Sequence, residues 1–149
     1  MLRREIFYYD KNDPRVLFQD IRACETTLCD GRKFNIRPNV IGDFRNMNYA
    51  DGSFSLVVFD PPHLVNKTKT GWQAIKYGTL DEKWQETLRK GFKECFRILK
   101  NDGFLIFKWN EEDIKVSEIL KLTEQKPILG HKSGKQSKTH WILFQKNSW

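Results

Sequence analysis

The sequence has few cysteines and no long apolar run, and each shortage excludes classes of protein. Its 149 residues include three cysteines, which form no CxxC pair. Such an odd set argues against a disulfide framework and against a structural zinc site. No apolar run approaches the length that spans a membrane, and no signal-peptide pattern opens the chain. We therefore expect a cytoplasmic protein without a metal site or membrane contact.

Apolar and basic residues, in contrast, are plentiful. The hydrophobic fraction of 39% and the aromatic fraction of 13% predict one folded domain over residues 1–149. The net charge of +7 favours a polyanionic partner, nucleic acid first. Lysines cluster without acids in residues 66–76 and 130–138. The alternative for each cluster is an ordinary solvated loop.

The hydrophobic pattern predicts strands that alternate with helices. Residues 54–60 read as a central parallel strand buried on both faces, and residues 80–100 as an amphipathic helix. Strands alternating with helices indicate an α/β protein with an open, mostly parallel sheet that ends in an antiparallel hairpin. Further strands are expected at 15–21, 39–44 and 104–109, a shorter helix at 111–122, a hairpin at 26–36 and the terminal hairpin around the basic loop at 130–138.

Three of the predicted strands end on an acid, namely Asp20, Asp43 and Asp60. Ligands of open α/β sheets bind beyond the carboxyl ends of the strands. A single aspartate there is explained equally well as a cap of the following turn. The three together predict a ligand site at one rim of the sheet.

Three segments resemble class I S-adenosylmethionine-dependent methyltransferases: "GDFRNMNYADGSFSLVVFDPPH" (42–63), "FRILKNDGFLIFKW" (96–109) and "THWILFQK" (139–146). The tetrapeptide "DPPH" is similar to the [DNS]-P-P-[YFWH] motif of relatives that modify an exocyclic amino group of adenine or cytosine. The resemblance extends over residues 39–146 and implies a Rossmann-like methyltransferase sheet. It also implies S-adenosylmethionine as cofactor and nucleic acid as substrate.

The resemblance assigns roles to the residues of the motif. Asp60 and the carbonyl of Pro61 would accept hydrogen bonds from the target amine, and His63 would stack on the base. Pro62 restricts the backbone of Pro61, so that this carbonyl is held in place. A base in a duplex would have to be flipped out to reach the site.

Other residues are assigned to the cofactor and to nucleic acid. Asp43 and Phe44 match the turn that holds the adenine ring of the cofactor, and Asp20 falls near the acid that grips the ribose. Basic and aromatic residues after the motif suit phosphates and bases, although a surface loop is an equal alternative. The expected nucleic-acid contacts are Lys67, Lys69, Trp72, Lys76, Lys132 and Lys135.

The glycine-rich turn of this family is missing, because Gly31 alone precedes Gly42 and belongs to the predicted hairpin. The N-terminal part of the fold is therefore expected to be abbreviated. Three explanations stay open: a minimal cofactor site, a homo-oligomer or partner subunit that completes the site, and lost activity. His131 and His140 flank the basic loop and are expected to be loop or sheet-edge residues.

The sequence thus supports three functions. The first is an amino-methyltransferase that acts on adenine or cytosine in DNA or RNA. The second is a non-catalytic subunit that binds nucleic acid or a partner through a degenerate methyltransferase fold. The third is a methyltransferase for a nitrogen of a protein or small molecule.

Overall fold

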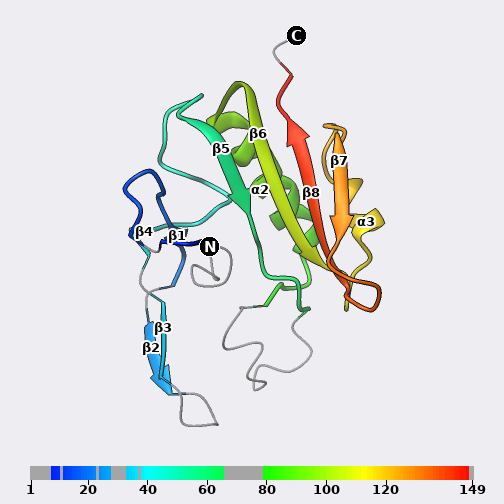
Figure 1. Ribbon diagram of the computed structural model, residues 1–149, viewed down its shortest axis with the longest axis horizontal. Coiled ribbons are helices and arrows are strands. Elements are labelled where there is room, and N and C mark those ends of the chain that lie inside the picture. Colours follow the sequence, from blue (N-terminus) through cyan, green and yellow to red (C-terminus); the bar gives the residue numbers. More distant parts are fainter. Residues whose placement is uncertain are drawn as a thin grey trace.

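The computed structural model describes residues 8–10, 12–22, 24–27, 33–36, 38–65 and 79–147. A four-stranded sheet in the order β5-β6-β8-β7 forms its centre (Figure 1). The β5–β6 pair is parallel, whereas β6–β8 and β8–β7 are antiparallel. The α/β class and the closing antiparallel hairpin are therefore confirmed. The strands are β5 (Phe54–Phe59), β6 (Leu99–Asn110), β7 (Leu129–Lys132) and β8 (Thr139–Gln145).

Two short strand pairs precede this sheet. The predicted hairpin is confirmed by the antiparallel pairing of β2 with β3, although its turn lies outside the described residues. The strands expected at 15–21 and 39–44 are reduced to two residues each, which pair in parallel as β1 and β4. The elements are β1 (Gln19–Asp20), β2 (Cys24–Thr27), β3 (Lys33–Ile36) and β4 (Val40–Ile41).

Helix α2 (Trp84–Ile98) covers one face of the sheet. Its apolar residues recur every three or four positions, and Leu88 and Phe92 are buried against the strands. Gly91 allows this close packing, because a Cβ there would lie 2.6 Å from the ring of Phe59. Phe92 on the helix contacts the rings of Phe59, Phe107 and Phe144 on the strands, so a group of aromatic rings lies in the core under the helix.

The helix expected at 111–122 is shorter than predicted. Helix α3 (Val116–Leu120) has five residues and starts after Lys115, whose backbone is extended. The indole of Trp109 donates a hydrogen bond to the carbonyl of Ile114, at 2.8 Å. This contact holds the preceding segment as a loop, which explains the later start of the helix.

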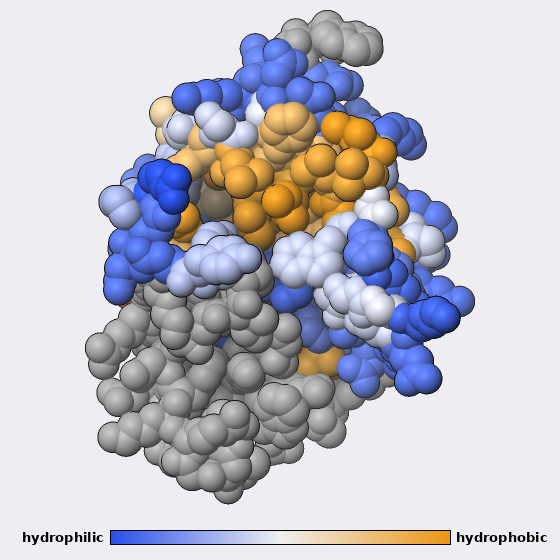
Figure 2. Space-filling model, viewed as in Figure 1, coloured by the Kyte–Doolittle hydropathy of each residue, from blue (hydrophilic) through white to orange (hydrophobic). Residues whose placement is uncertain are grey.

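The opposite face of the sheet is apolar and open, so the prediction that β5 is a central strand buried on both faces is wrong. Strand β5 is an edge strand of the four-stranded sheet, and Leu56 keeps 52% of its surface exposed. Figure 1 shows α2 behind the sheet, and Figure 2 shows apolar residues gathered on the near side. Because strand side chains alternate, α2 covers only every second one. Within the described ranges, no helix covers the near side.

Substitutions at two adjacent residues of β5 test this arrangement. Leu56 lies on the open face, and Val57 packs against the core. We expect Leu56→Ser to change the free energy of unfolding by less than about 0.5 kcal/mol. Val57→Ala should destabilise by about 1 kcal/mol, because it removes partly buried methyl groups. Urea titrations of both variants would measure this. Equal losses would mean that the face of Leu56 is covered.

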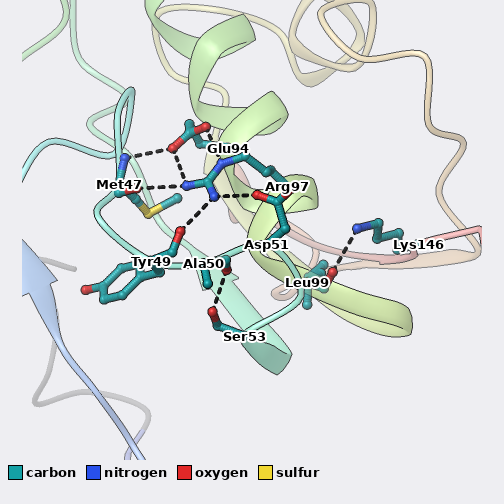
Figure 3. A network of polar contacts seen from close by, with 9 residues as sticks. All are labelled: Met47, Tyr49, Ala50, Asp51, Ser53, Glu94, Arg97, Leu99 and Lys146. Atoms are coloured by element: carbon teal, nitrogen blue, oxygen red, sulfur yellow. Dashed lines mark hydrogen bonds and ion pairs between the residues drawn. The ribbon is translucent and has the colours of Figure 1, made fainter.

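The segment before β5 is held on α2 by Arg97 (Figure 3). Its guanidinium donates to the carbonyl oxygens of Met47 and Tyr49, at 2.8 and 2.7 Å. The same group forms ion pairs with Asp51 and Glu94, at 2.8 and 2.7 Å. One side chain thus links the helix to the turn that leads into β5. Among the described residues, no helix has the length and apolar character to cross a membrane.

Candidate functional site

A cavity of about 850 Å³ lies between the β1–β4 pair and β5. It extends along β5 and reaches the residues that follow the carboxyl ends of these strands. Asp20, Asp43 and Asp60 all line it, so the three strand-end acids share one cavity. The short chain segments after parallel strands bring together acids that are far apart in the sequence.

Asp20 ends β1 and is 7% exposed. Its Oδ1 accepts a hydrogen bond from the backbone N–H of Arg22, at 3.0 Å. Its Oδ2 is buried and has no hydrogen-bond partner among the described residues. A buried, unsatisfied carboxylate oxygen is costly, and here it belongs to a residue that lines a cavity. The geometry suits a ligand that brings a hydroxyl or amine donor.

Asp43 follows β4 and is held by Arg45. The guanidinium of Arg45 contacts both carboxylate oxygens, at 2.6 Å for Nη2 to Oδ2 and 3.0 Å for Nε to Oδ1. These hydrogen bonds hold the pKa of Asp43 below its usual value. The pair stabilises the fold above the ordinary pKa of an aspartate, and this contribution is lost only as the pH falls through the lowered pKa. A ligand amine at Asp43 would have to share the carboxylate with Arg45.

Phe44 contacts both the cavity and the core of the sheet. It lines the cavity, and its ring meets that of Phe59 edge to face, with 5.1 Å between the centroids. This packing anchors the turn that carries Asp43 to the core of the sheet. The position of the turn is therefore set by aromatic packing rather than by local sequence alone.

Asp60 follows β5 directly, and its carboxylate is almost buried, with 12% of the side chain exposed. Its Oδ2 lies 3.5 Å from Nζ of Lys108 on the adjacent strand β6. Pro61 is buried, and Pro62 also lines the cavity. The ring of His63 lies edge-on to that of Trp109, with 6.4 Å between the centroids. The motif residues thus lie between the cavity and the end of β6.

Two residues near Asp60 were missed by sequence reasoning. Lys108 is buried, and the only signal for it was a lysine within the apolar run "FLIFKW". The ring of Tyr8 meets that of Phe18 at 4.9 Å. Burial, and to a smaller extent the charge of Asp60, raises the pKa of the Tyr8 phenol. No local pattern could have indicated Tyr8, because it is 52 positions away from Asp60 in the chain.

Four of the remaining predicted residues belong to the terminal hairpin. His140 lies within β8, an inner strand of the sheet, so the prediction of a loop or sheet-edge position is wrong for this residue. Its Nε2 is 3.0 Å from Oε1 of Glu111. His131, Lys132 and Lys135 are exposed to solvent on β7 and the loop that follows it. The predicted contacts Lys67, Lys69, Trp72 and Lys76 lie outside the described residues.

No protein-family profile matches the sequence, and no curated protein matches it at a significant level. Among solved structures, a Pyrococcus horikoshii protein aligns over 72% of this chain and 58% of its own, with 15% identity and a TM-score of 0.49. A SAM-dependent methyltransferase from Leishmania major aligns over 72% and 44%, with 14% identity and a TM-score of 0.45. A proposed DNA modification methylase from Thermus thermophilus aligns over 71% and 52%, with 22% identity and a TM-score of 0.45. The chain thus spans about half the length of the structures it is similar to.

Proposed function

We propose that the protein is an S-adenosylmethionine-dependent methyltransferase that acts on an exocyclic amino group of adenine or cytosine in nucleic acid. One observation carries the proposal. Asp60, followed by Pro61, Pro62 and His63, borders the cavity that Asp20 and Asp43 also line. The proposed amine-binding motif and the two proposed cofactor acids thus border the same cavity, which supports the proposal.

The residues around the cavity fit the cofactor. The volume of about 850 Å³ is within the range of small-molecule sites. The unsatisfied Oδ2 of Asp20 suits a ribose hydroxyl, which would supply the missing donor. Asp43 and Phe44 would hold the adenine ring, the first by accepting from its amino group. When bound, the cofactor supplies a methyl group on a positively charged sulfur.

The motif would act on the geometry of the target amine. The nitrogen of an aromatic amine is a poor nucleophile, because its lone pair is delocalised into the ring. Acceptance of its two protons by the Asp60 carboxylate and the Pro61 carbonyl would favour a tetrahedral nitrogen with a more available lone pair. Transfer of the methyl group to this nitrogen would leave the electron pair of the broken carbon–sulfur bond on the sulfur of the cofactor, and the methylated nitrogen would lose one proton to solvent.

Nucleic acid is the proposed substrate because the chain is basic and has aromatic residues that could stack on bases. The chain has a net charge of +7, and Lys132 and Lys135 are exposed near the end of the sheet that bears the motif. Lysines there would contact phosphates, as would those predicted at Lys67, Lys69 and Lys76. Trp72 and His63 would stack on bases. Flipping the target base out of a duplex would cost a few kcal/mol.

A non-catalytic subunit is the second candidate. The open apolar face, on which Leu56 and Phe104 are 52% and 38% exposed, favours association with another chain. The missing glycine-rich turn favours this second candidate as well. If a homo-oligomer or a partner subunit instead completed the cofactor site, the assembly would be an enzyme. A methyltransferase for a nitrogen of a protein or small molecule is the third, and in it the exposed lysines would be incidental.

Calorimetric titration with S-adenosylmethionine and S-adenosylhomocysteine tests the proposal. We expect micromolar binding by the wild type. Asp20→Ala and Asp43→Ala should each weaken it by about tenfold to a hundredfold, because each removes a hydrogen bond to a charged group. Glu124→Ala, at an exposed acid outside the cavity lining, should leave the affinity unchanged. A folded, monodisperse chain that binds neither compound would reject a self-contained enzyme.

A further inference from the structure

A row of four side chains crosses the open face of the sheet at the level of the motif. Phe59 pairs with Phe107, so the next residues, Asp60 and Lys108, lie side by side. Lys108 pairs with Trp141 on β8, and Trp141 pairs with His131 on β7. Directly opposite residues share a face. Asp60, Lys108, Trp141 and His131 therefore form one row from β5 to β7.

Lys108 is held in this row from two sides. Its Nζ lies 3.5 Å from Oδ2 of Asp60 and 5.2 Å from the ring centroid of Trp141. The second distance is typical of a cation–π contact. Only 7% of the lysine is exposed, so its charge is almost removed from water. Asp60 and Trp141 together compensate for that loss of hydration.

Stability alone does not account for a lysine at this position. A buried ion pair gains little against the cost of desolvating both charges, and apolar residues of similar volume often serve a fold equally well. The adjacent row on the same face contains Val58, Ile106 and Leu143, which an apolar residue at 108 would extend. The ammonium is therefore better explained by what it does to Asp60.

We infer that Lys108 is a positioning residue for Asp60, whose carboxylate it orients for acceptance from the target amine. The inference rests on the proposed function. An ionised carboxylate has about four lone-pair sites, so contact with Lys108 at Oδ2 is compatible with acceptance from a substrate. A carboxylate oriented before the substrate arrives needs no reorganisation during the reaction. Trp141 in turn restrains the lysine.

Methyl transfer by lysine variants tests this role. The assay follows transfer from tritiated S-adenosylmethionine to unmethylated double-stranded DNA and to total RNA. We expect Lys108→Met to lower kcat at least ~tenfold, as for a lost preorganised contact, with the cofactor affinity from calorimetry unchanged. Lys108→Arg should recover part of the rate, because it restores the charge. Lys93→Met, at an exposed position of α2, should match the wild type. A wild-type kcat in Lys108→Met would overturn the inference.

A double-mutant cycle tests the contact between Asp60 and Lys108 without an activity assay. Asp60→Asn and Lys108→Met should each lower the thermal midpoint, and the double variant should lose less than the sum of the two, because the contact between the two side chains can be lost only once. Additive losses would overturn the pairing. A wild type that binds the cofactor but methylates neither nucleic acid would reject the proposed function and, with it, the positioning role of Lys108. The cycle would still decide the pairing, so the two failures are distinguishable.

Discussion

Replacing Asp60 by asparagine is expected to reduce methyl transfer by about 10²–10³-fold while the cofactor still binds. The estimate is that for loss of one preorganised polar group at a reacting centre. An asparagine keeps the shape of the side chain but replaces one carboxylate oxygen with an amide group that donates. It therefore removes the anionic acceptor that the target amine needs, and it leaves Lys108 next to a neutral group.

The measurement is kcat with tritiated cofactor, combined with calorimetry and a thermal melt of the same preparation. The control is Glu124→Gln, which also replaces a carboxylate with an amide but at an exposed position, and it should behave as the wild type. Because Asp60→Asn removes the carboxylate that faces a buried lysine, the Asp60→Asn/Lys108→Met variant provides a second test in which both members of the pair are neutral. Undiminished transfer by either folded variant would reject the role of Asp60 and the amine-directed mechanism with it.

Replacing Arg97 by alanine is expected to lower the thermal midpoint by about 5–10 °C. A shift of this size is typical when several polar contacts of one side chain are lost in a domain of this length. The substitution removes the donors to the carbonyl oxygens of Met47 and Tyr49 and both ion pairs of the guanidinium. Met47 also packs against the core, so the turn before β5 would lose its attachment to α2. Scanning calorimetry would measure the shift.

Arg97→Lys is the matched variant. A lysine keeps the charge but cannot reach carbonyl and carboxylate groups in several directions at once, so we expect it to recover only a minor part of the loss. Arg89→Ala, an exposed position of the same helix, should shift the midpoint by no more than a degree or two. If Arg97→Ala behaved like Arg89→Ala, the turn at 47–51 would be held by apolar packing alone.

The predictions from sequence that agree with the structure depend on local patterns. The three- and four-residue spacing of Leu88 and Phe92 indicated α2, and the Asp30-Gly31 dipeptide indicated the β2–β3 hairpin. The placement of acids at strand ends indicated a shared rim, and Asp20, Asp43 and Asp60 line one cavity. Each of these signals acts over a few residues or follows from the direction of the chain in a parallel sheet.

The prediction for β5 was wrong for a reason that no local pattern reveals. A near-continuous apolar run such as "FSLVVF" indicates burial on both faces, yet Leu56 is exposed because β5 is an edge strand and α2 covers one side only. Whether an apolar face is covered depends on which elements are present elsewhere.

The sequence by itself determined the α/β class, the amphipathic helix, the hairpins and the motif at Asp60, because these follow from residue spacing and turn chemistry. The tertiary structure alone decided which side chains meet. It placed Lys108 beside Asp60 through the register of β5 with β6, and it joined Arg97 to a turn about 50 positions earlier. Among the residues that the structure describes, it also left Oδ2 of Asp20 without a hydrogen-bond partner in the lining of the cavity. Contacts of this kind depend on strand order and helix packing, which distant parts of the chain establish together.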